Sequence, residues 1–335
     1  MVERQNYKVG VIGAGSWGTA LAILFARNGH DVFLWARDKD QAEKMSLEAR
    51  NSRYLPDVVF PNTLHATSDL ETVVTRSELL VLVIPSSAFR HVANQIGKYI
   101  RPQTDVLLAT KGFEKDSFKL MHEVCIEELG KDRNVAVVSG PTFAKEVAKG
   151  LPTAITVACD NDEFANKVAD IMHNETFRAY TSNDLIGVEV GGAVKNVLAI
   201  AAGIADGLEF GANTRAALIT RGLVEIQRLG VALGADPRTF MGLAGLGDLV
   251  LTCTDDQSRN RRVGISLAAG ESLEQIQLKL GQVAEGVYAA KEAHQLAKQL
   301  KVEMPIVEHV YRIIYKKEDP LAAVHALLGR SIKSE

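Results

Sequence analysis

A strand, a glycine-rich turn and a helix follow one another near the start of the chain, and they constrain its fold more than any other feature. Residues 9–12 are apolar and rich in β-branched side chains, as expected of a buried parallel strand. The turn Gly13-Ala14-Gly15-Ser16-Trp17-Gly18 follows at once, and residues 19–26 have the pattern of a buried helix. The first glycine permits the tight turn, the second lets the backbone approach a pyrophosphate, and the third allows close packing of helix on strand. We therefore predict a dinucleotide site at the helix N-terminus, with a plain glycine turn as the alternative.

The second predicted strand, residues 33–36, bears on which dinucleotide is bound. Its end is expected to meet the adenine ribose, where NAD sites usually carry Asp or Glu. Here Arg37 comes first and Asp38 follows. The forked, permanently charged guanidinium of arginine suits a 2′-phosphate, which an acid would repel. The sequence thus favours NADP(H). Asp38 keeps NAD(H) open, and a solvated loop charge is the alternative role for Arg37.

Further apolar runs suggest a doubly wound sheet in the first half of the chain. Residues 79–84, 106–109, 135–138 and 154–157 alternate with helical patterns, which predicts a mostly parallel sheet. Ligands in such sheets bind beyond the carboxyl ends of the strands. The candidates at these strand ends are Pro85, Lys111 and Gly140.

The pattern changes near residue 185, where strand signals fade and Ala- and Leu-rich helical patterns begin. The chain has 335 residues, enough for two domains of ordinary size. We therefore expect an α/β fold with a Rossmann-like dinucleotide-binding domain at residues 1–185. An all-helical substrate and catalytic domain is expected at residues 186–335, with its last helix ending near Gly329.

Composition narrows the classes of protein that the chain can belong to. The net charge of −3 argues against a nucleic-acid partner. Three cysteines without a Cys-x-x-Cys pair favour a reducing compartment. The spacings typical of metal sites do not occur in the sequence, so we predict no bound metal. The polar N-terminus does not resemble a signal peptide, and no uncharged apolar run approaches the length of a membrane span. We expect a cytoplasmic protein.

A single lysine stands out in the second half. Residues 186–205 carry only two charged side chains, Glu189 and Lys195, so this helix should be buried nearly all round. A buried ammonium group is costly unless it is paired. Desolvation also lowers the pKa of a lysine, which suits it to donate a proton near neutral pH. The alternative is a structural ion pair between Lys195 and Glu189.

Two later segments supply groups that suit an anionic substrate. Asp248, in Gly245-Leu246-Gly247-Asp248, is placed either to hold Lys195 or a substrate hydroxyl, or to cap a helix. The densest basic cluster, Ser258–Arg262, suits a phosphate group, because arginine binds phosphate through paired hydrogen bonds. Lys111 offers a second positive charge if it lies in the same cleft. For the basic cluster and for Lys111, the alternative role is a solvated surface charge.

In this order, the motifs resemble those of the bacterial NAD(P)-dependent glycerol-3-phosphate dehydrogenases over essentially the whole chain. The ordered set is specific, although each motif alone is weak. The matching segments are residues 13–18, 111–113, 139–144, 187–196, 245–249, 258–261 and 283–286.

The resemblance implies reversible reduction of dihydroxyacetone phosphate to sn-glycerol 3-phosphate for phospholipid synthesis, by a homodimer, with Lys195 as the catalytic proton donor. Position 142 is often serine in relatives, and threonine keeps the hydroxyl. The implied substrate-site residues are Lys111, Gly140, Thr142, Lys195, Asp248, Ser258, Arg259 and Asn260. The cofactor residues, including the glycine turn, are Gly13, Gly15, Ser16, Trp17, Gly18, Arg37, Lys111, Ala144, Arg259, Val283 and Glu285.

Two other functions are compatible with these residues. One is a related two-domain reductase that acts on another phosphorylated substrate or on a hydroxy acid. The other is a non-catalytic NADP(H) sensor, which would not need a desolvated lysine, an aspartate and an arginine cluster together.

Overall fold

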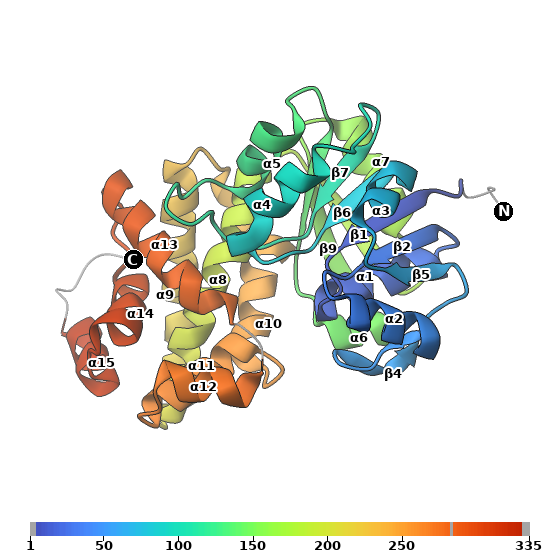
Figure 1. The fold of residues 1–335 in the computed structure, drawn as a ribbon. Helices are drawn as coiled ribbons and strands as arrows, with labels where there is room; N and C mark the ends of the chain where they lie inside the picture. The colour runs from blue at the N-terminus through green and yellow to red at the C-terminus, as the bar shows by residue number, and fades with distance from the viewer. Residues whose placement is uncertain (1–4, 282–283, 330–335) are drawn as a thin grey trace.

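The computed structural model describes residues 5–281 and 284–329, and it shows a sheet-based part beside a helical part (Figure 1). The strands of the main sheet are β1 (Lys8–Ile12), β2 (Asp31–Trp35), β5 (Leu64–Thr67), β6 (Leu79–Leu82), β7 (Asp105–Leu108), β8 (Val135–Ser139), β9 (Thr153–Ala158) and β10 (Phe177–Ser182). Two further strands, β3 (Arg50–Asn51) and β4 (Leu55–Val59), pair in an antiparallel manner and form a separate two-stranded sheet. The eight strands lie in the order β10-β9-β8-β7-β6-β1-β2-β5. All neighbours are parallel except β8 and β9, which confirms the mostly parallel sheet.

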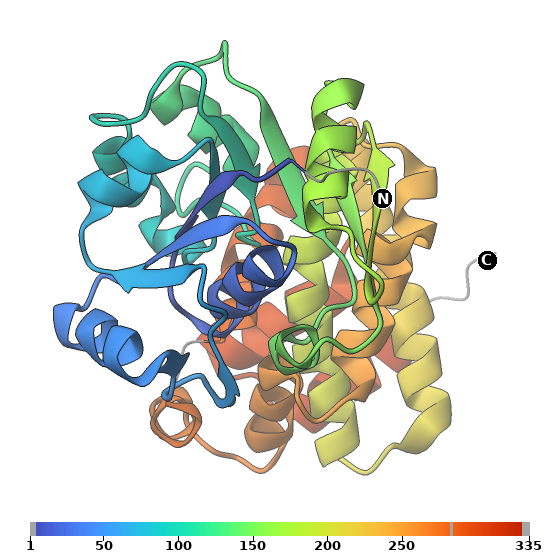
Figure 2. The same cartoon turned by 90° about the vertical axis from the view of Figure 1, so that its right-hand side faces the viewer.

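Helices cover both faces of this sheet, which explains why strands such as β6 and β8 are buried along their whole length. Figure 2 shows the arrangement from a second side. One face packs against α1 (Ser16–Arg27), α2 (Lys39–Glu48), α6 (Ala144–Lys149) and α7 (Asp162–Met172). The other packs against α3 (Leu70–Arg76), α4 (Ser86–Ile96) and α5 (Met121–Leu129).

The order of the strands places a topological switch point at the neighbouring strands β1 and β6. From β1 the chain runs to β2 and β5 on one side, then returns to β6 on the other. Ligands bind at such switch points, beyond the carboxyl ends of the strands. The glycine turn follows β1 at this edge. Beside it, the Thr110 hydroxyl donates to the carbonyl of Ile84 at 2.8 Å and accepts from the Ile84 amide at 3.2 Å, which fixes the segments that follow β6 and β7.

The helical part is built around α8 (Leu185–Gly207), whose residues Leu185–Ala205 are almost all buried. A Cβ atom at Gly203 would lie 1.9 Å from the carbonyl oxygen of Arg261, so glycine is needed for the close crossing of the two helices. The surrounding elements are α9 (Gly211–Ala232), η1 (Pro237–Met241), η2 (Leu243–Gly247), α10 (Asp248–Thr254), α11 (Arg259–Ala268), α12 (Leu273–Leu280), α13 (Glu285–Leu300), α14 (Pro305–Lys316) and α15 (Pro320–Leu328).

By length and composition α8 is apolar enough to cross a membrane, although it carries the charged residues Glu189 and Lys195. In the structure, 94% of its most apolar window is buried, as in the core helix of a globular protein.

The two parts share packed surfaces where α8 begins. The Asp184 side chain caps the helix by accepting a hydrogen bond from the Gly187 amide at 2.8 Å. Leu185 and Val188 belong to the apolar core beneath the sheet. Conversely, Phe113 and Leu120, which lie in the loop after β7, pack into the apolar core of the helical part. The domain boundary at residue 185 stays a prediction, and it falls at the first residue of α8.

Candidate active site

The glycine turn has the geometry that a dinucleotide pyrophosphate requires. Gly13 has a φ of 121°, and a Cβ there would lie 2.3 Å from the carbonyl oxygen of Val83. A Cβ at Gly18 would lie 1.9 Å from the carbonyl oxygen of Gly13, whereas one at Gly15 would meet no atom within 4 Å. The space is therefore open only where a ligand would approach. Gly15 precedes α1 without a side-chain cap, so the first amides of the helix remain available for an anion.

Residues around the turn hold it in place. The Asn51 side-chain amide donates to the carbonyl of Ala14 at 3.0 Å and to the Thr19 hydroxyl at 2.8 Å. Trp17 lies against the apolar core, and its buried Nε1 atom has no hydrogen-bond partner. A buried donor without a partner at this place suits a ligand that would satisfy it.

Arg37 is exposed just after β2, at the edge where the adenine ribose is expected. Asp38 has a local structural role: its carboxylate caps α2 and accepts a hydrogen bond from the Gln41 amide at 2.9 Å. The acid that left NAD(H) open in the sequence is therefore committed to a helix cap.

A buried cluster of charged groups joins the two parts of the molecule. The Lys111 ammonium lies 2.8 Å from Oδ2 of Asp248, and the Lys195 ammonium binds the other carboxylate oxygen, Oδ1. Lys195 also donates to the Thr252 hydroxyl at 2.9 Å. Lys195 is 7% exposed and Asp248 1%. Lys111 lies in the segment that follows β7, whereas the other three residues belong to α8 and α10.

This arrangement decides between the alternatives for these residues. Lys195 pairs with Asp248, so the expected alternative of an ion pair with Glu189 is wrong. Glu189 instead faces His122 on α5, accepting from its backbone amide at 3.1 Å and contacting its Nδ1 atom. Asp248 is the first residue of α10, and its carboxylate turns to the lysines rather than to the helix amides.

The surroundings set the protonation behaviour of the pair. Burial lowers the pKa of Lys195 to about 8, an effect that the Lys111 charge adds to and the Asp248 carboxylate opposes. For Asp248, burial works against ionisation, but the two lysines outweigh it and lower the pKa of the carboxyl. The result is an ionised aspartate beside an ammonium that releases its proton near neutral pH.

The basic segment divides into groups with different surroundings. Ser258 caps α11 by accepting from the Arg261 amide at 3.2 Å, so the helix begins at Arg259. Arg261 is bound by Asp206 and Asp256, which removes it from the phosphate cluster that the sequence suggested. Arg259 and Asn260 form the first turn of α11.

Asn260 connects α11 to the helix that carries the lysine. Its side-chain amide donates to Asn196 Oδ1 at 2.9 Å, and its oxygen accepts from the Gly286 amide at 3.0 Å. Asn196 directly follows Lys195, and Glu285 directly precedes Gly286 at the start of α13. Burial raises the pKa of the Glu285 carboxyl, against the opposing charges of Arg259, Lys111 and Lys195.

The remaining predicted positions lie at the end of β8. Gly140 follows the strand with a φ of 155°, and the Thr142 hydroxyl donates to its carbonyl at 3.1 Å. Ala144 is the first residue of α6. Val283 lies outside the described residues. The structure thus brings Lys111, Lys195 and Asp248 into direct contact, while the individual roles of the predicted site residues stay predictions.

Thr252 and the pairing of His122 with Glu189 were not predicted from the sequence. Thr252 stands four residues after Asp248 on α10, so helical spacing placed it on the same face. His122 carries no such signal, because its contact with Glu189 joins positions 67 residues apart.

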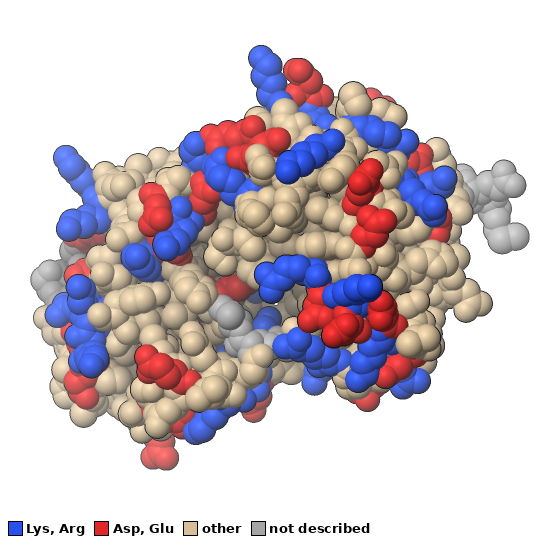
Figure 3. All heavy atoms as spheres, in the orientation of Figure 1, with Lys and Arg blue, Asp and Glu red and all other residues tan. Residues whose placement is uncertain are grey.

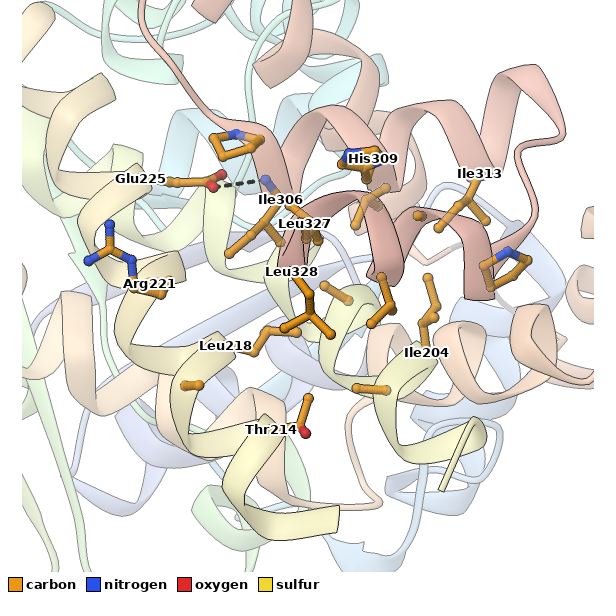
Figure 4. Close-up of a pocket in the computed structure, with 18 of the residues that line it drawn as sticks. Ile204, Thr214, Leu218, Arg221, Glu225, Ile306, His309, Ile313, Leu327 and Leu328 are labelled. Atoms are coloured by element: carbon orange, nitrogen blue, oxygen red, sulfur yellow. Dashed lines mark hydrogen bonds between the residues drawn. The ribbon is translucent and has the colours of Figure 1, made fainter. Parts of the chain in front are cut away.

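Away from this buried cluster, the structure shows mixed surface charge and a mainly apolar pocket. On the face shown in Figure 3, basic and acidic side chains are interspersed. A pocket of about 490 Å³ lies between α8, α9, α14 and α15, with Leu218, Ile306 and Leu327 among its mainly apolar lining (Figure 4). Neither Lys195 nor Asp248 lines this pocket.

Comparisons with known proteins agree with this architecture. Residues 8–165 match the family model of the NAD-dependent glycerol-3-phosphate dehydrogenase N-terminus, and residues 184–325 match that of the C-terminus. The chain is 52% identical over 328 residues to "Glycerol-3-phosphate dehydrogenase [NAD(P)+]" of Pseudoalteromonas translucida, with 98% of each chain covered. It is 51% identical over 335 residues to the protein of the same name from Escherichia coli, covering 100% of this chain and 99% of the other.

A solved structure extends the agreement to three dimensions. The crystal structure of glycerol-3-phosphate dehydrogenase from Coxiella burnetii matches with a TM-score of 0.94 and 46% identity, over 97% of this chain and 99% of that one. Sequence and fold therefore place this chain in the family of NAD-dependent glycerol-3-phosphate dehydrogenases, which are oxidoreductases.

Proposed function

We propose that this chain catalyses the reversible, NAD(P)H-dependent reduction of dihydroxyacetone phosphate to sn-glycerol 3-phosphate, with Lys195 as the proton donor. The observation that carries this assignment is the buried Lys195 ammonium held by Asp248 and Thr252. A lysine ammonium has three N–H donors. Two of them are used by these partners, so the third is left for a ketone oxygen.

The chemistry follows from what each side chain holds. The nicotinamide ring supplies the hydride when the cofactor is bound. As negative charge develops on the carbonyl oxygen, Lys195 stabilises it and gives up its proton. Asp248 orients the ammonium and stays ionised beside it, because Lys111 provides a second positive charge. In the oxidation direction, neutral Lys195 takes the proton from the alcohol.

The start of α11 is proposed to bind the substrate phosphate. Ser258 already caps one amide of this helix, and Arg259 and Asn260 occupy its first turn. Amides and positive charge at a helix N-terminus favour an anion. Binding energy from the phosphate, away from the reacting carbon, then fixes the orientation of the ketone against Lys195.

The dinucleotide is proposed to lie beyond the carboxyl ends of β1 and β6, at the topological switch point. The open space at Gly15, the uncapped start of α1 and the unpartnered Trp17 Nε1 all suit it. Ser16, Ala144, Glu285 and Val283 complete the proposed set. Exposed Arg37 is placed for a 2′-phosphate, so NADP(H) is the proposed preference, with NAD(H) also accepted.

The proposal includes a cytoplasmic homodimer that supplies sn-glycerol 3-phosphate to phospholipid synthesis. The family resemblance supports each of these points. The three free, buried cysteines suit a reducing compartment, and sedimentation of the purified protein tests the dimer.

Steady-state turnover tests the function. We expect rapid NADPH oxidation with dihydroxyacetone phosphate, slower oxidation of NADH, and little turnover of unphosphorylated dihydroxyacetone. Activity on a hydroxy acid instead would favour a related reductase. Cofactor binding without turnover of any carbonyl would favour a sensor.

A further inference from the structure

One buried hydroxyl near the charged cluster has no hydrogen-bond partner. Ser139 ends β8, is 2% exposed, and its Oγ atom is buried without a partner. The four preceding residues of the strand, Val135–Val138, are all apolar. Buried polar groups are nearly always paired, and exceptions occur where a ligand completes them. A serine here therefore needs an explanation that strand packing does not give.

The position of this hydroxyl links it to the proposed substrate site. A Cβ atom at Gly192 would lie 2.8 Å from Ser139 Oγ and 3.5 Å from Lys111 Cδ. The hydroxyl and the aliphatic part of Lys111 therefore converge on the bare face of Gly192. Gly192 lies three residues before Lys195, one turn along the same helix. Ser139 thus approaches the lysine from the sheet side.

The order of contacts along α8 matches the order of groups in the substrate. Ser139 lies at the level of Gly192, Lys195 follows, and Asn260 contacts Asn196 beyond it. In dihydroxyacetone phosphate, a free hydroxymethyl group and a phosphate-bearing carbon flank the ketone. If the phosphate lies at Asn260 and the ketone at Lys195, the free hydroxyl falls on the side of Ser139.

We propose that Ser139 is a specificity-determining residue whose hydroxyl binds the free hydroxyl of the substrate. This inference rests on the proposed function. The contact would satisfy the unpartnered group, and it would distinguish the substrate from a phosphorylated ketone that lacks the hydroxyl.

The test compares two substrates in the full-length enzyme and in Ser139→Ala. Hydroxyacetone phosphate is the same ketone without the free hydroxyl. We expect the wild type to prefer dihydroxyacetone phosphate in kcat/KM by about tenfold to a hundredfold. In Ser139→Ala this preference should fall to within about threefold, with the loss falling on dihydroxyacetone phosphate. An unchanged preference in the variant would overturn the proposal.

Controls separate this result from a loss of folding and from a failure of the proposed function. Ser139→Cys keeps a side chain of similar shape with a much weaker donor and should show the same loss of preference. Ser77→Ala removes a buried hydroxyl that donates to the Val73 carbonyl at 2.6 Å, so it should lower Tm and leave the preference intact. Ser139→Ala should not lower the Tm of the ligand-free protein, because it removes no existing hydrogen bond. A wild type that turns over neither ketone would contradict the proposed function itself.

Discussion

The Lys195 ammonium and the Asp248 carboxylate form an ion pair in which both side chains are almost completely buried. Such a pair is sensitive to the loss of either partner, because the remaining charge would stay in a place of low dielectric. Burial lowers the pKa of the lysine to about 8 although the carboxylate opposes the shift, and this value is close to the pH at which a proton donor works best.

The pKa of Lys195 sets the expected pH dependence. Reduction needs the protonated lysine, so kcat/KM for dihydroxyacetone phosphate should be level below about pH 8 and fall as the pH rises through that value. Oxidation of glycerol 3-phosphate needs the neutral lysine, so its kcat/KM should rise through the same range. Rate profiles in the two directions measure this relationship. Profiles that change in the same direction would contradict the role of Lys195.

Asp248→Asn should move that transition to lower pH. The substitution removes the negative charge that opposes loss of the lysine proton, while burial and the Lys111 charge remain. The reduction rate should therefore begin to fall at a lower pH than in the wild type. The same rate profile measures the shift, and an unchanged midpoint would show that the carboxylate does not act on Lys195.

Lys195→Ala should lower kcat for reduction by about a hundredfold to ten-thousandfold, the range typical of a lost general acid. Cofactor affinity should change little, because Lys195 is not among the residues proposed to bind the dinucleotide. Fluorescence titration with NADPH, beside steady-state kinetics, measures both quantities. Lys298→Ala on the exposed side of α13 is the control and should match the wild type. Equal losses of rate and cofactor affinity would count against the catalytic role.

Arg37→Ser should raise KM for NADPH by about tenfold to a hundredfold and leave KM for NADH nearly unchanged. The reason is the loss of charge-assisted hydrogen bonds to the 2′-phosphate, each worth about 1.5–3 kcal/mol. Arg178→Ser, at the exposed far edge of the sheet on β10, is a matched control. An unchanged ratio of the two KM values would return Arg37 to the role of a solvated loop charge.

The fold was largely predictable because its signals are local. The strand that ends at Ile12, the glycine turn and the apolar helix over residues 186–205 all follow from patterns within a few turns of chain. The antiparallel placement of β9 beside β8 was not predictable, because a buried strand has the same apolar pattern in either direction.

The site was less predictable because its contacts cross the chain. From the sequence, Asp248 could hold Lys195, hold a substrate hydroxyl or cap a helix. In the fold its carboxylate binds Lys195 and Lys111. Arg261 belongs to the same basic run as Arg259, but Asp206 reaches it from α8. Ser139 lies in an apolar strand, so its pattern gives no sign that the hydroxyl lacks a partner.

Glu189→Gln should destabilise the protein most at acidic pH. Burial alone would lower the pKa of His122, but the Glu189 carboxylate outweighs it and raises this pKa. Stability from a raised histidine pKa is fully present below the unfolded value of about 6.5 and is lost as the pH rises through the folded value. The neutral amide cannot stabilise the imidazolium, so the cost should be on the order of 1.5–3 kcal/mol near pH 6. Thermal unfolding of wild type and variant from about pH 6 to pH 9 measures the difference, which should shrink toward the alkaline end.

Glu163→Gln, on the exposed side of α7, is the control for this series and should follow the wild type at every pH. Two parallel curves for Glu189→Gln and wild type would show that the charge on His122 adds no stability, because the glutamine oxygen can still accept a hydrogen bond from the His122 amide. Convergence at high pH would show instead that the charge on His122 helps to hold α5 against α8. The pairing of Glu189 with His122 rather than with Lys195 would then have a measurable consequence, because Glu189 would stabilise the imidazolium of His122 while Asp248 holds the ammonium of Lys195.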